Sequence, residues 1–544
     1  MRPKTFVRRD IRRSAVRVAS VCLGAVVAVG LAACGSSSTS TSTSTSTSSA
    51  STNATPKHGG SLTVLEGASF AGSWPGLDPA TDTDGAANQS YMNAIYGDLF
   101  ELGTGGKLIP DLATGYSYAN GGKTVNLTVR QGVTFSDGTP FNAAAVVFNW
   151  KRDLAGTCTC KPVFLSAPVI KQTGPYSLSL TLSYVDAPFI NSLQAAIFNW
   201  IASPTALQKM GEKAFALTPV GAGPFTVVSD TPGSQLVLKK NPHYWEQGKP
   251  YLDNLTFKTV AADEPAYEAM LAGSAQAYEG MSTPQLVNTF KSHFQVTAEP
   301  STSPYDIQLN TKAAPFNNIQ ARQAIYYATN AAQIDKALFQ NTYPVTESFT
   351  AQAGLFYEPT VPGYIGYNLA KAQALVKAVG GINITLDTIT SPVAESLDEA
   401  LQTQWQAAGM KVTLHTYDLT GLIAVFQSHK WQSFLQTAGA YDPGTGVGVS
   451  FRFASTSPFT GVFDKNVDNM INAAASTVDS TQRAADYAAL NAYIAKEAYG
   501  PFLFPIAGYS IADHGVGGPG LTTAIPSVVV LPGILWQDVY NNNG

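Results

Sequence analysis

The sequence predicts an α/β protein of two or three lobes, preceded by a segment that does not fold with them. Strand-like and helix-like stretches alternate in the second half of the chain, which is typical of α/β architecture. Apolar residues make up 45% of the chain and charged residues only 13%, so a large core can be buried. About 490 residues follow position 56, more than one hydrophobic core usually supports.

Residues 1–33 have the pattern of a signal peptide. Seven basic residues lie between Arg2 and Arg17, and the apolar run from Ser20 to Cys34 carries no charge. That run is shorter than the roughly 20 strongly apolar residues of a membrane-spanning helix. Leu31-Ala32-Ala33-Cys34 resembles a lipobox, which predicts cleavage before Cys34 and a lipid on its thiol. A plain secretory signal is the alternative, and the export route, general secretory or twin-arginine, stays open.

Residues 34–56 form a tether that is mostly Ser and Thr. Such a segment cannot bury apolar surface, and its expected root-mean-square reach is roughly 25–30 Å. Without the signal, which holds seven basic residues and one acidic residue, the chain has a net charge of −10. This balance gives no reason to expect binding to nucleic acid or to anionic lipid headgroups.

Two cysteines remain once the signal and Cys34 are set aside. They are Cys158 and Cys160, in the sequence GTCTCK. We favour a local disulfide between them, with free thiols as the next alternative. A metal site is disfavoured because no His or further Cys lies nearby in the sequence to complete it.

The elements of the folded part are predicted from hydrophobic period and turn residues. Gly59-Gly60 frees the entry to a first alternating strand, and Asn120-Gly121-Gly122 supplies the turn of a hairpin that starts at Tyr116. We expect further strands at 176–184, 224–230, 234–241, 254–260, 305–310, 384–388 and 411–417. We expect helices at 142–154, 263–272, 319–339, 369–379 and 393–408.

Most enzyme signatures are absent from the sequence. There is no G-x-S-x-G elbow and no H-E-x-x-H pair, and the six histidines are scattered. The GGKT sequence at Gly121 is better explained as a hairpin turn than as a phosphate loop, and GTGVG at Gly444 lacks the flanking strand and helix of a dinucleotide site. We therefore expect no catalysis, no cofactor and no resident metal.

A series of motifs runs through the folded part in a fixed order. They are Leu77-Asp78-Pro79, IYGDLFE from Ile95, KLIPDLA from Lys107, LTVRQGVTFSDGTPFNAAAVVFNWKR from Leu127, PVGAGPF from Pro219, KKNPHYWEQGKPYLDNLTF from Lys239 and APFNNIQARQAIYYA from Ala314. With these motifs the chain resembles the extracytoplasmic solute-binding proteins of peptide- and nickel-type ABC transporters. The resemblance covers Gly59 to about Pro505. Most of the motif residues suit a scaffold, and Arg322 is expected to pair with a carboxylate at a helix start.

The resemblance implies a periplasmic-binding-protein-like fold of type II, with two lobes joined by hinge strands and an extra subdomain. Lobe I would comprise residues 57–100, 215–310 and 495–544, the extra subdomain 101–214, and lobe II 311–494. Closure of the lobes about the hinge would bury the ligand.

The resemblance also places the ligand. From lobe I it implies the loop at 81–87, with Thr83, Asp84 and Gly85 as candidates. From lobe II it implies the segment at 438–443, where Asp442 would pair with the α-ammonium of a peptide; a plain turn before Pro443 is the alternative.

The segment at 438–443 differs from the usual sequence of the family. Ala440-Tyr441 stands where the family usually carries Trp, and a Gly-rich stretch follows. Tyr441, Trp431 and Trp74 are therefore candidates for stacking on a sugar or another flat solute, and packing is the alternative for each. No His or Cys arrangement suits nickel.

The expected function is binding of an oligopeptide or similar solute, as a monomer, and delivery to an ABC permease. A peptide-sensing lipoprotein and an oligosaccharide-binding member of the same family are the alternatives. A lipid anchor at Cys34 retains a binder where no outer wall confines it, which favours a single-membrane, Gram-positive-type envelope.

Overall fold

The computed structural model describes residues 55–67, 76–82, 88–158, 160, 164, 166–193, 197–281, 283–437, 441–445, 448–526 and 533–544. The predicted signal, Cys34 and nearly all of the tether lie outside these residues, as do Trp74, Thr83, Asp84 and Gly85. Within the described residues, no helix combines the length and the apolar character needed to cross a membrane.

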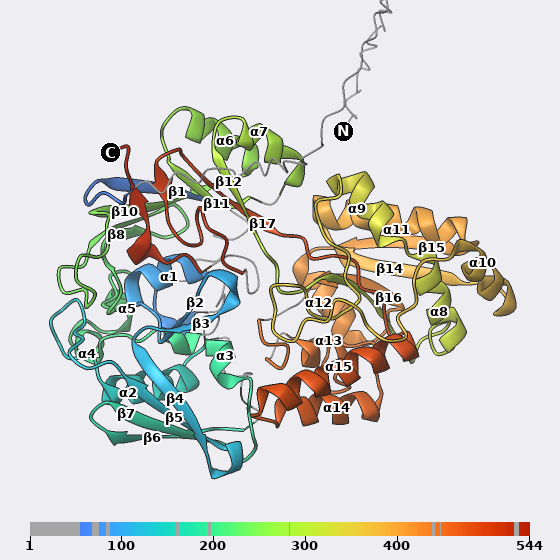
Figure 1. Cartoon of the computed structure of the whole chain (residues 1–544), viewed down its shortest axis with the longest axis horizontal. Helices are drawn as coiled ribbons and strands as arrows, with labels where there is room; N and C mark the ends of the chain where they lie inside the picture. The colour runs from blue at the N-terminus through green and yellow to red at the C-terminus, as the bar shows by residue number, and fades with distance from the viewer. Residues whose placement is uncertain are drawn as a thin grey trace, which may run out of the picture. The chain divides into compact units, whose positions relative to one another are not determined.

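The largest sheet of the described chain has seven strands and forms the centre of lobe I (Figure 1). In spatial order they are β12 (Gln295–Glu299), β17 (Gly508–Ala512), β11 (Ala277–Met281), β1 (Ser61–Gly67), β10 (Asn254–Val260), β9 (Gln235–Lys240) and β8 (Phe225–Thr231). Alternation along β1 sends Leu62 and Val64 into the core shared with helix α1 (Gln89–Tyr96). It sends Leu65 to the opposite face, against α6 (Asp263–Leu271) and α7 (Val287–Lys291).

Short elements accompany the large sheet. In the ranges predicted for lobe I they are η1 (Pro79–Thr81), η7 (Pro284–Leu286), β18 (Val516–Gly517), η8 (Trp536–Asp538) and β19 (Tyr540–Asn541). At the predicted boundary with the extra subdomain they are β2 (Phe100–Leu102), η3 (Thr104–Gly106) and β3 (Leu108–Pro110). Trp536 in η8 is buried in the same core as α1, and its indole N–H donates to the carbonyl of Ser90.

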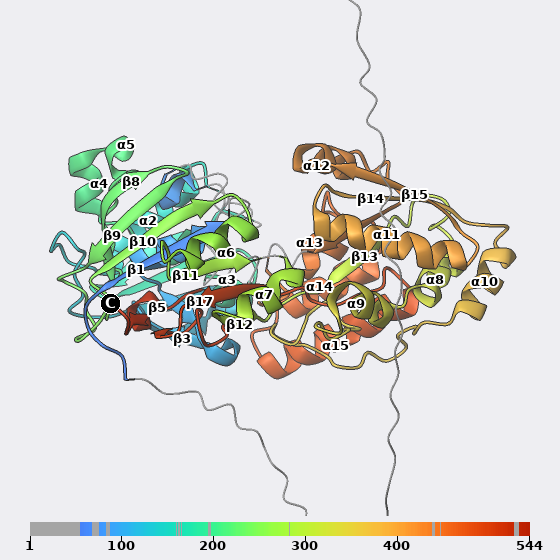
Figure 2. The same ribbon diagram turned by 90° about the horizontal axis from the view of Figure 1, so that it is seen from above.

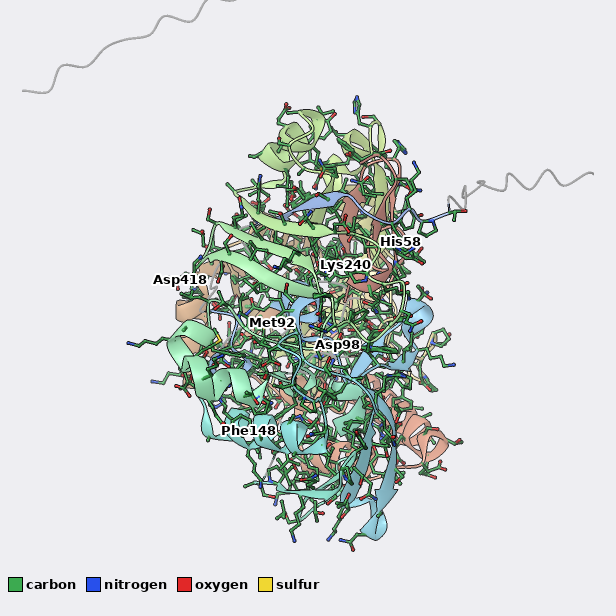
Figure 3. The ribbon with its side chains drawn as sticks, turned by 90° about the vertical axis from the view of Figure 1, so that its left-hand side faces the viewer. His58, Met92, Asp98, Phe148, Lys240 and Asp418 are labelled. Carbon is green, nitrogen blue, oxygen red and sulfur yellow. A yellow bond between two sulfur atoms is a disulfide. The ribbon has the colours of Figure 1, made fainter. Side chains whose placement is uncertain are left out.

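A four-stranded antiparallel sheet forms the extra subdomain. Its strands, in spatial order, are β4 (Ala113–Ala119), β5 (Thr124–Val129), β7 (Ser177–Thr181) and β6 (Val169–Gly174), and η4 (Asn120–Gly122) turns β4 into β5. Helices α2 (Ala143–Ala155), α3 (Phe189–Leu193), η6 (Ile197–Asn199), α4 (Pro204–Met210) and α5 (Glu212–Phe215) accompany it. In Figure 3, Phe148 marks helix α2, which lies beside this sheet, and Met92 marks helix α1, which lies below the large sheet.

Lobe II is built on a second four-stranded sheet with helices around it (Figure 2). The sheet order is β13 (Tyr305–Leu309), β16 (Ser433–Thr437), β14 (Asn383–Ile389) and β15 (Lys411–Tyr417). The helices are α8 (Ile319–Ala328), α9 (Ala331–Phe339), α10 (Leu369–Ala378), α11 (Pro392–Ala407), α12 (Leu419–Ser428), α13 (Val449–Phe453), α14 (Lys465–Ala475) and α15 (Ser480–Glu497). Strand β13 belongs to this sheet. It starts at Tyr305, a few residues before position 311, where the resemblance places the start of lobe II.

The chain passes between the two sheets twice, and the two passages pair with each other. Glu299 at the end of β12 lies opposite Gly508 at the start of β17. Farther on, the Tyr305 N–H donates to the Phe504 carbonyl (3.1 Å), and the Leu503 N–H donates to the Tyr305 carbonyl (2.8 Å). We call residues 299–305 and 503–508 the crossing segments.

The α/β class and the positions of the predicted elements are confirmed, with two corrections. The helix expected at 319–339 is two helices, because Thr329 is extended and Asn330 caps α9 by accepting from the Gln333 N–H. Within the described residues, Arg322 forms no ion pair with a carboxylate. Its guanidinium donates to the backbone carbonyls of Phe316 and Glu497.

Candidate ligand site

In the main sheets of both lobes, the carboxyl ends of the parallel strands lie at the edge next to the crossing segments. In lobe I, β1 and β11 are parallel, and β12 runs in the same direction because each of β11 and β12 is antiparallel to β17. The carboxyl ends of all three strands therefore lie at the edge from which the chain leaves for lobe II. In lobe II, β14, β15 and β16 are parallel to one another and antiparallel to β13, whose first residue follows the crossing segment. Crevices outside the carboxyl ends of strands are the usual ligand sites of α/β sheets.

Asp442 lies at this edge of lobe II, after β16, and is fully buried. Arg483 on α15 binds both of its carboxylate oxygens, at 2.7 and 2.9 Å. The Asn191 side-chain amide donates to the same carboxylate at 2.8 Å, and so does the Gly444 N–H at 3.0 Å. Asp442 therefore already has a cation inside the protein, and its predicted pairing with a ligand ammonium would have to displace or share Arg483.

Three further contacts fix the position of the Arg483 side chain. Its Nε donates to the Ala474 carbonyl (3.2 Å), and its guanidinium lies 5.0 Å from the ring centre of Phe356 and 5.6 Å from that of Tyr487. Although burial alone would lower it, the pKa of Arg483 is raised by the Asp442 charge and hydrogen bonds, so the guanidinium stays charged.

Asn191 belongs to the extra subdomain, so this network joins it to lobe II. The backbone adds a second link, because the Ala187 N–H donates to the Ala475 carbonyl at 3.0 Å. We call Asn191, Asp442, Arg483 and the Ala187–Ala475 bond the Asp442 joint.

Tyr441 and Trp431 are both packed in this structure. Tyr441 is buried with Leu102, Ile525 and Leu535, and its hydroxyl donates to the Gly106 carbonyl. Trp431 is 2% exposed and meets Phe434 edge-on, with ring centres 4.6 Å apart. These contacts are those of core residues. A stacking role for either ring stays a prediction that needs a rearrangement.

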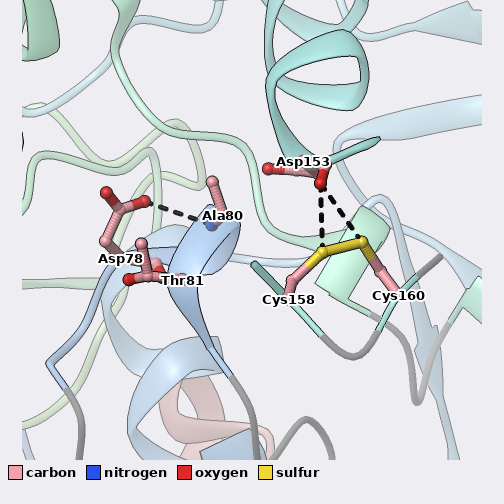
Figure 4. The surroundings of a disulfide bond; sticks show 6 residues. All are labelled: Asp78, Ala80, Thr81, Asp153, Cys158 and Cys160. Carbon is pink, nitrogen blue, oxygen red and sulfur yellow. Dashed lines mark hydrogen bonds between the residues drawn. A yellow bond between two sulfur atoms is a disulfide. The ribbon is translucent and has the colours of Figure 1, made fainter. Parts of the chain in front are cut away.

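The structure joins Cys158 and Cys160 by a disulfide (Figure 4). The two sulfur atoms lie 3.2 and 3.6 Å from the Asp153 carbonyl oxygen. The N–H groups of Thr157 and Cys158 donate to the carbonyl of Ala80, which directly follows Leu77-Asp78-Pro79. The disulfide loop is thus hydrogen-bonded to the backbone just before the predicted ligand loop at 81–87.

Three buried glutamates lie at the lobe I edge, and the sequence analysis did not single them out. Glu66 on β1 is the register partner of Glu279 on β11, and Glu299 ends β12. Glu279 accepts a hydrogen bond from the Ser90 hydroxyl (2.6 Å), and Glu299 accepts one from the Ser510 hydroxyl (2.5 Å). We call these three carboxyl groups the acidic row. The available signal was an acidic residue inside an apolar strand, as in SLTVLEG, at a position that alternation assigns to the core.

Burial dominates the electrostatics of the acidic row. It raises the pKa of Glu279 to about 8 despite the Ser90 hydrogen bond. Burial, and after it the Glu279 charge, raises the pKa of Glu66 well above its usual range. Burial also raises the pKa of Glu299, against the lowering effect of Ser510.

Comparisons with known proteins agree with this architecture. Residues 107–461, more than half of the chain, match the family model described as bacterial extracellular solute-binding proteins, family 5 Middle. The chain belongs to this family. The glutathione-binding protein GsiB of Salmonella typhi is 29% identical over 364 residues, which are 66% of this chain and 69% of that protein.

Solved structures of members and relatives share the fold of this solute-binding protein. The ABC transporter substrate-binding protein CtaP of Listeria monocytogenes aligns with a TM-score of 0.77 at 21% identity, covering 89% of this chain and 100% of the other. The periplasmic binding protein DppA of Helicobacter pylori, in complex with the peptide STSA, aligns with a TM-score of 0.67 at 22% identity, covering 89% and 99%. The predicted family and the predicted two-lobed fold of type II are thereby confirmed.

Proposed function

We propose that this protein captures a short peptide or a peptide-like solute outside the cell and delivers it to an ABC importer. The observation that carries the proposal is the similarity to a glutathione-binding protein over two thirds of both chains. Glutathione is itself a tripeptide. The fold shared with a protein solved around the peptide STSA is consistent with the same class of ligand. We further propose attachment to the membrane through a lipid on Cys34, with residues 34–56 as the tether, and action as a monomer.

Titration calorimetry tests the ligand class. The mature chain is titrated with glutathione, with di-, tri- and tetrapeptides, and with maltotriose and cellotriose. We expect saturable binding of at least one peptide and none of the sugars, because Trp431 and Tyr441 offer no open ring face for a sugar. Binding of a sugar with indifference to every peptide contradicts the proposal and favours the oligosaccharide-binding alternative.

Delivery to an importer is tested in cells. Deletion of the gene is expected to abolish uptake of a radiolabelled form of the peptide that binds. Restoration of the full-length chain should recover uptake. If uptake is unchanged while a transcriptional response to the peptide is lost, the protein is a sensor instead.

A further inference from the structure

Among the described residues the acidic row has no paired cation, in contrast to two buried carboxylates of lobe II. In lobe II, Asp442 is paired with Arg483, and Asp306 on β13 lies 3.2 Å from the guanidinium of Arg452. In the described part of the chain, no Lys, Arg or His side chain forms an ion pair with Glu66, Glu279 or Glu299. Arginine side chains therefore neutralise Asp306 and Asp442, whereas the acidic row has no such partner in the described part of the chain.

Among the described residues, each member of the row also keeps an oxygen atom without a hydrogen-bond partner. These atoms are Glu66 Oε1, Glu279 Oε1 and Glu299 Oε2, and each of the three side chains is at most 3% exposed. Buried carboxylate oxygens are rarely left unpaired, because an unsatisfied group costs about 1–3 kcal/mol or more. At the hinge end of the row, a Cβ atom added at Gly508 would lie 3.0 Å from Glu299 Oε2, so the glycine leaves that oxygen room.

The groups are arranged to act together. Glu66 and Glu279 lie on the adjacent strands β1 and β11, whereas β17 lies between β11 and β12, which carries Glu299. All three strands run in the same direction in one sheet, and the Glu279 charge acts on both of the other carboxyl groups. Two neighbouring carboxyl groups cannot both ionise in a buried site without a cation between them. The edge on which they lie is the one from which the chain crosses to lobe II, which is where a solute held between lobes would be placed.

We propose that the acidic row binds a cationic group of the solute, an ammonium or a guanidinium, and so selects cationic or zwitterionic peptides over neutral ones. This inference rests on the proposed function and names the chemical class of its ligand. In the empty protein, protons on the carboxyl groups take the place of the cation. When the cation enters, at least one carboxyl group ionises and its proton passes to solvent, so binding near neutral pH releases protons.

Calorimetry in buffers of different ionisation enthalpy measures that release. The mature chain is titrated in phosphate and in Tris at pH 7.5 with Ala-Ala-Ala, with its N-acetylated form and with Ala-Lys-Ala. Loss of binding on acetylation identifies the α-ammonium as the cation. Tighter binding of Ala-Lys-Ala than of Ala-Ala-Ala identifies a side-chain cation instead. For the probe that binds best, we expect net release of about one proton per site.

Three variants that remove charge but keep shape test the row itself: Glu66→Gln, Glu279→Gln and Glu299→Gln. Each should weaken binding of the cationic probe about tenfold or more, as expected for loss of a charge-assisted hydrogen bond in a buried site. Glu279→Gln should also reduce the proton release. The matched control is Asp398→Asn on α11. Asp398 is a buried carboxyl group whose pKa is raised by burial to about 8, and it has no paired cation among the described residues, yet it lies in lobe II away from the row.

A probe that is not a peptide separates this inference from the proposed function. Cadaverine should raise the melting temperature of the wild-type chain and not that of Glu279→Gln, whereas 1,5-pentanediol should affect neither. Peptide binding without proton release, unchanged in all three Gln variants, overturns the acidic row and leaves the proposed function standing. A cadaverine effect without binding of any peptide supports the row and overturns the proposed function. No response to any of these probes overturns both.

Discussion

At the scale of single residues, Arg483 neutralises a buried carboxylate of lobe II. It is the only cation paired with Asp442 among the described residues, and that carboxylate is fully buried. Removing one partner of such a pair leaves a buried charge unpaired, which typically destabilises a protein by 3–5 kcal/mol.

We therefore expect Arg483→Met to lower the free energy of unfolding by about 3–5 kcal/mol, measured by urea denaturation. The double variant Asp442→Asn/Arg483→Met should recover most of this loss, because no charge is then left unpaired. Lys496→Met on the exposed side of the same helix is the control and should change stability by less than about 0.5 kcal/mol. A single variant as stable as wild type would show that Asp442 is solvated or protonated.

The acidic row predicts how stability changes with pH. The pKa of Glu279 is about 8 in the folded chain and near 4.5 when unfolded, so between these values the folded state holds a proton that the unfolded state has lost. The contribution of Glu279 to stability is fully present below pH 4.5 and is lost as pH rises to about 8.

Thermal unfolding of the empty protein at pH 5, 6, 7 and 8 checks this. The melting temperature of the wild type should fall more steeply over this range than that of Glu279→Gln, which cannot ionise at this position. Parallel curves for the two proteins would contradict the raised pKa. Glu66 and Glu299 add the same direction of change, so the single variant removes only part of the slope.

Little of this residue-level detail could be predicted from the sequence. Asn191 and Asp442 are 251 residues apart, and nothing local marks them as partners. Asp442 itself was singled out through the resemblance, but its pairing with Arg483 depends on how α15 packs, which no local pattern encodes. Asp84 and the rest of the loop at 81–87 stay predictions.

At the scale of elements, the PVGAGPF motif is explained by close backbone contact. A Cβ atom at Gly221 would lie 2.3 Å from the Ile95 carbonyl oxygen, and one at Gly223 would lie 2.5 Å from the Gly97 nitrogen. These two glycines let the strand entry to β8 lie directly against the end of α1. Its hydrogen bonds run from Ala222 N–H to the Tyr96 carbonyl and from Gly223 N–H to the Ile95 carbonyl.

Gly223→Ala should therefore destabilise the chain by more than about 2 kcal/mol, because backbone on both sides must move apart. Gly115→Ala, in β4, is the matched control. It meets nothing within 4 Å and should be tolerated. Differential scanning calorimetry measures the melting temperatures of both variants. Equal values would contradict the close backbone contact between Gly223 and Gly97.

Elements with a clear period and clear ends were predictable. Residues 254–260 and 411–417 are strands with the predicted bounds. The division between α8 and α9 was not predicted, because Ile319 to Phe339 keeps a helical pattern of apolar residues through the break. Asn330, which caps α9, was the local signal for it.

At the scale of the whole molecule, the proposed lipid on Cys34 would decide where the protein works. The proposed lipid predicts that the full-length chain partitions into the detergent phase of Triton X-114 when expressed in a bacterium that processes lipoproteins. Cys34→Ala should move it to the aqueous phase or the medium. Cys22→Ala, which alters only the signal, is the control and should leave partitioning unchanged. Aqueous partitioning of the wild type would favour a plain secretory signal.

The fold and the family were predictable at this scale because ordered motifs span nearly the whole folded chain. The meeting of three separate segments at the Asp442 joint was not predictable. It depends on the mutual placement of the extra subdomain and lobe II, and motifs such as Leu77-Asp78-Pro79 report the presence of each part without its contacts.

The pairing of the crossing segments has an evolutionary consequence. Tyr305 and Leu503 are hydrogen-bonded neighbours, so the stretch between them leaves and rejoins the rest of the chain at one place. Such a stretch behaves as a cassette that can be exchanged between homologous genes by two recombination events without rerouting any other segment. A chimaera made at these junctions would inherit Asp442 and Arg483 from one parent, and Asn191 and the acidic row from the other, so a new specificity can arise from the exchange of whole segments rather than from point mutations.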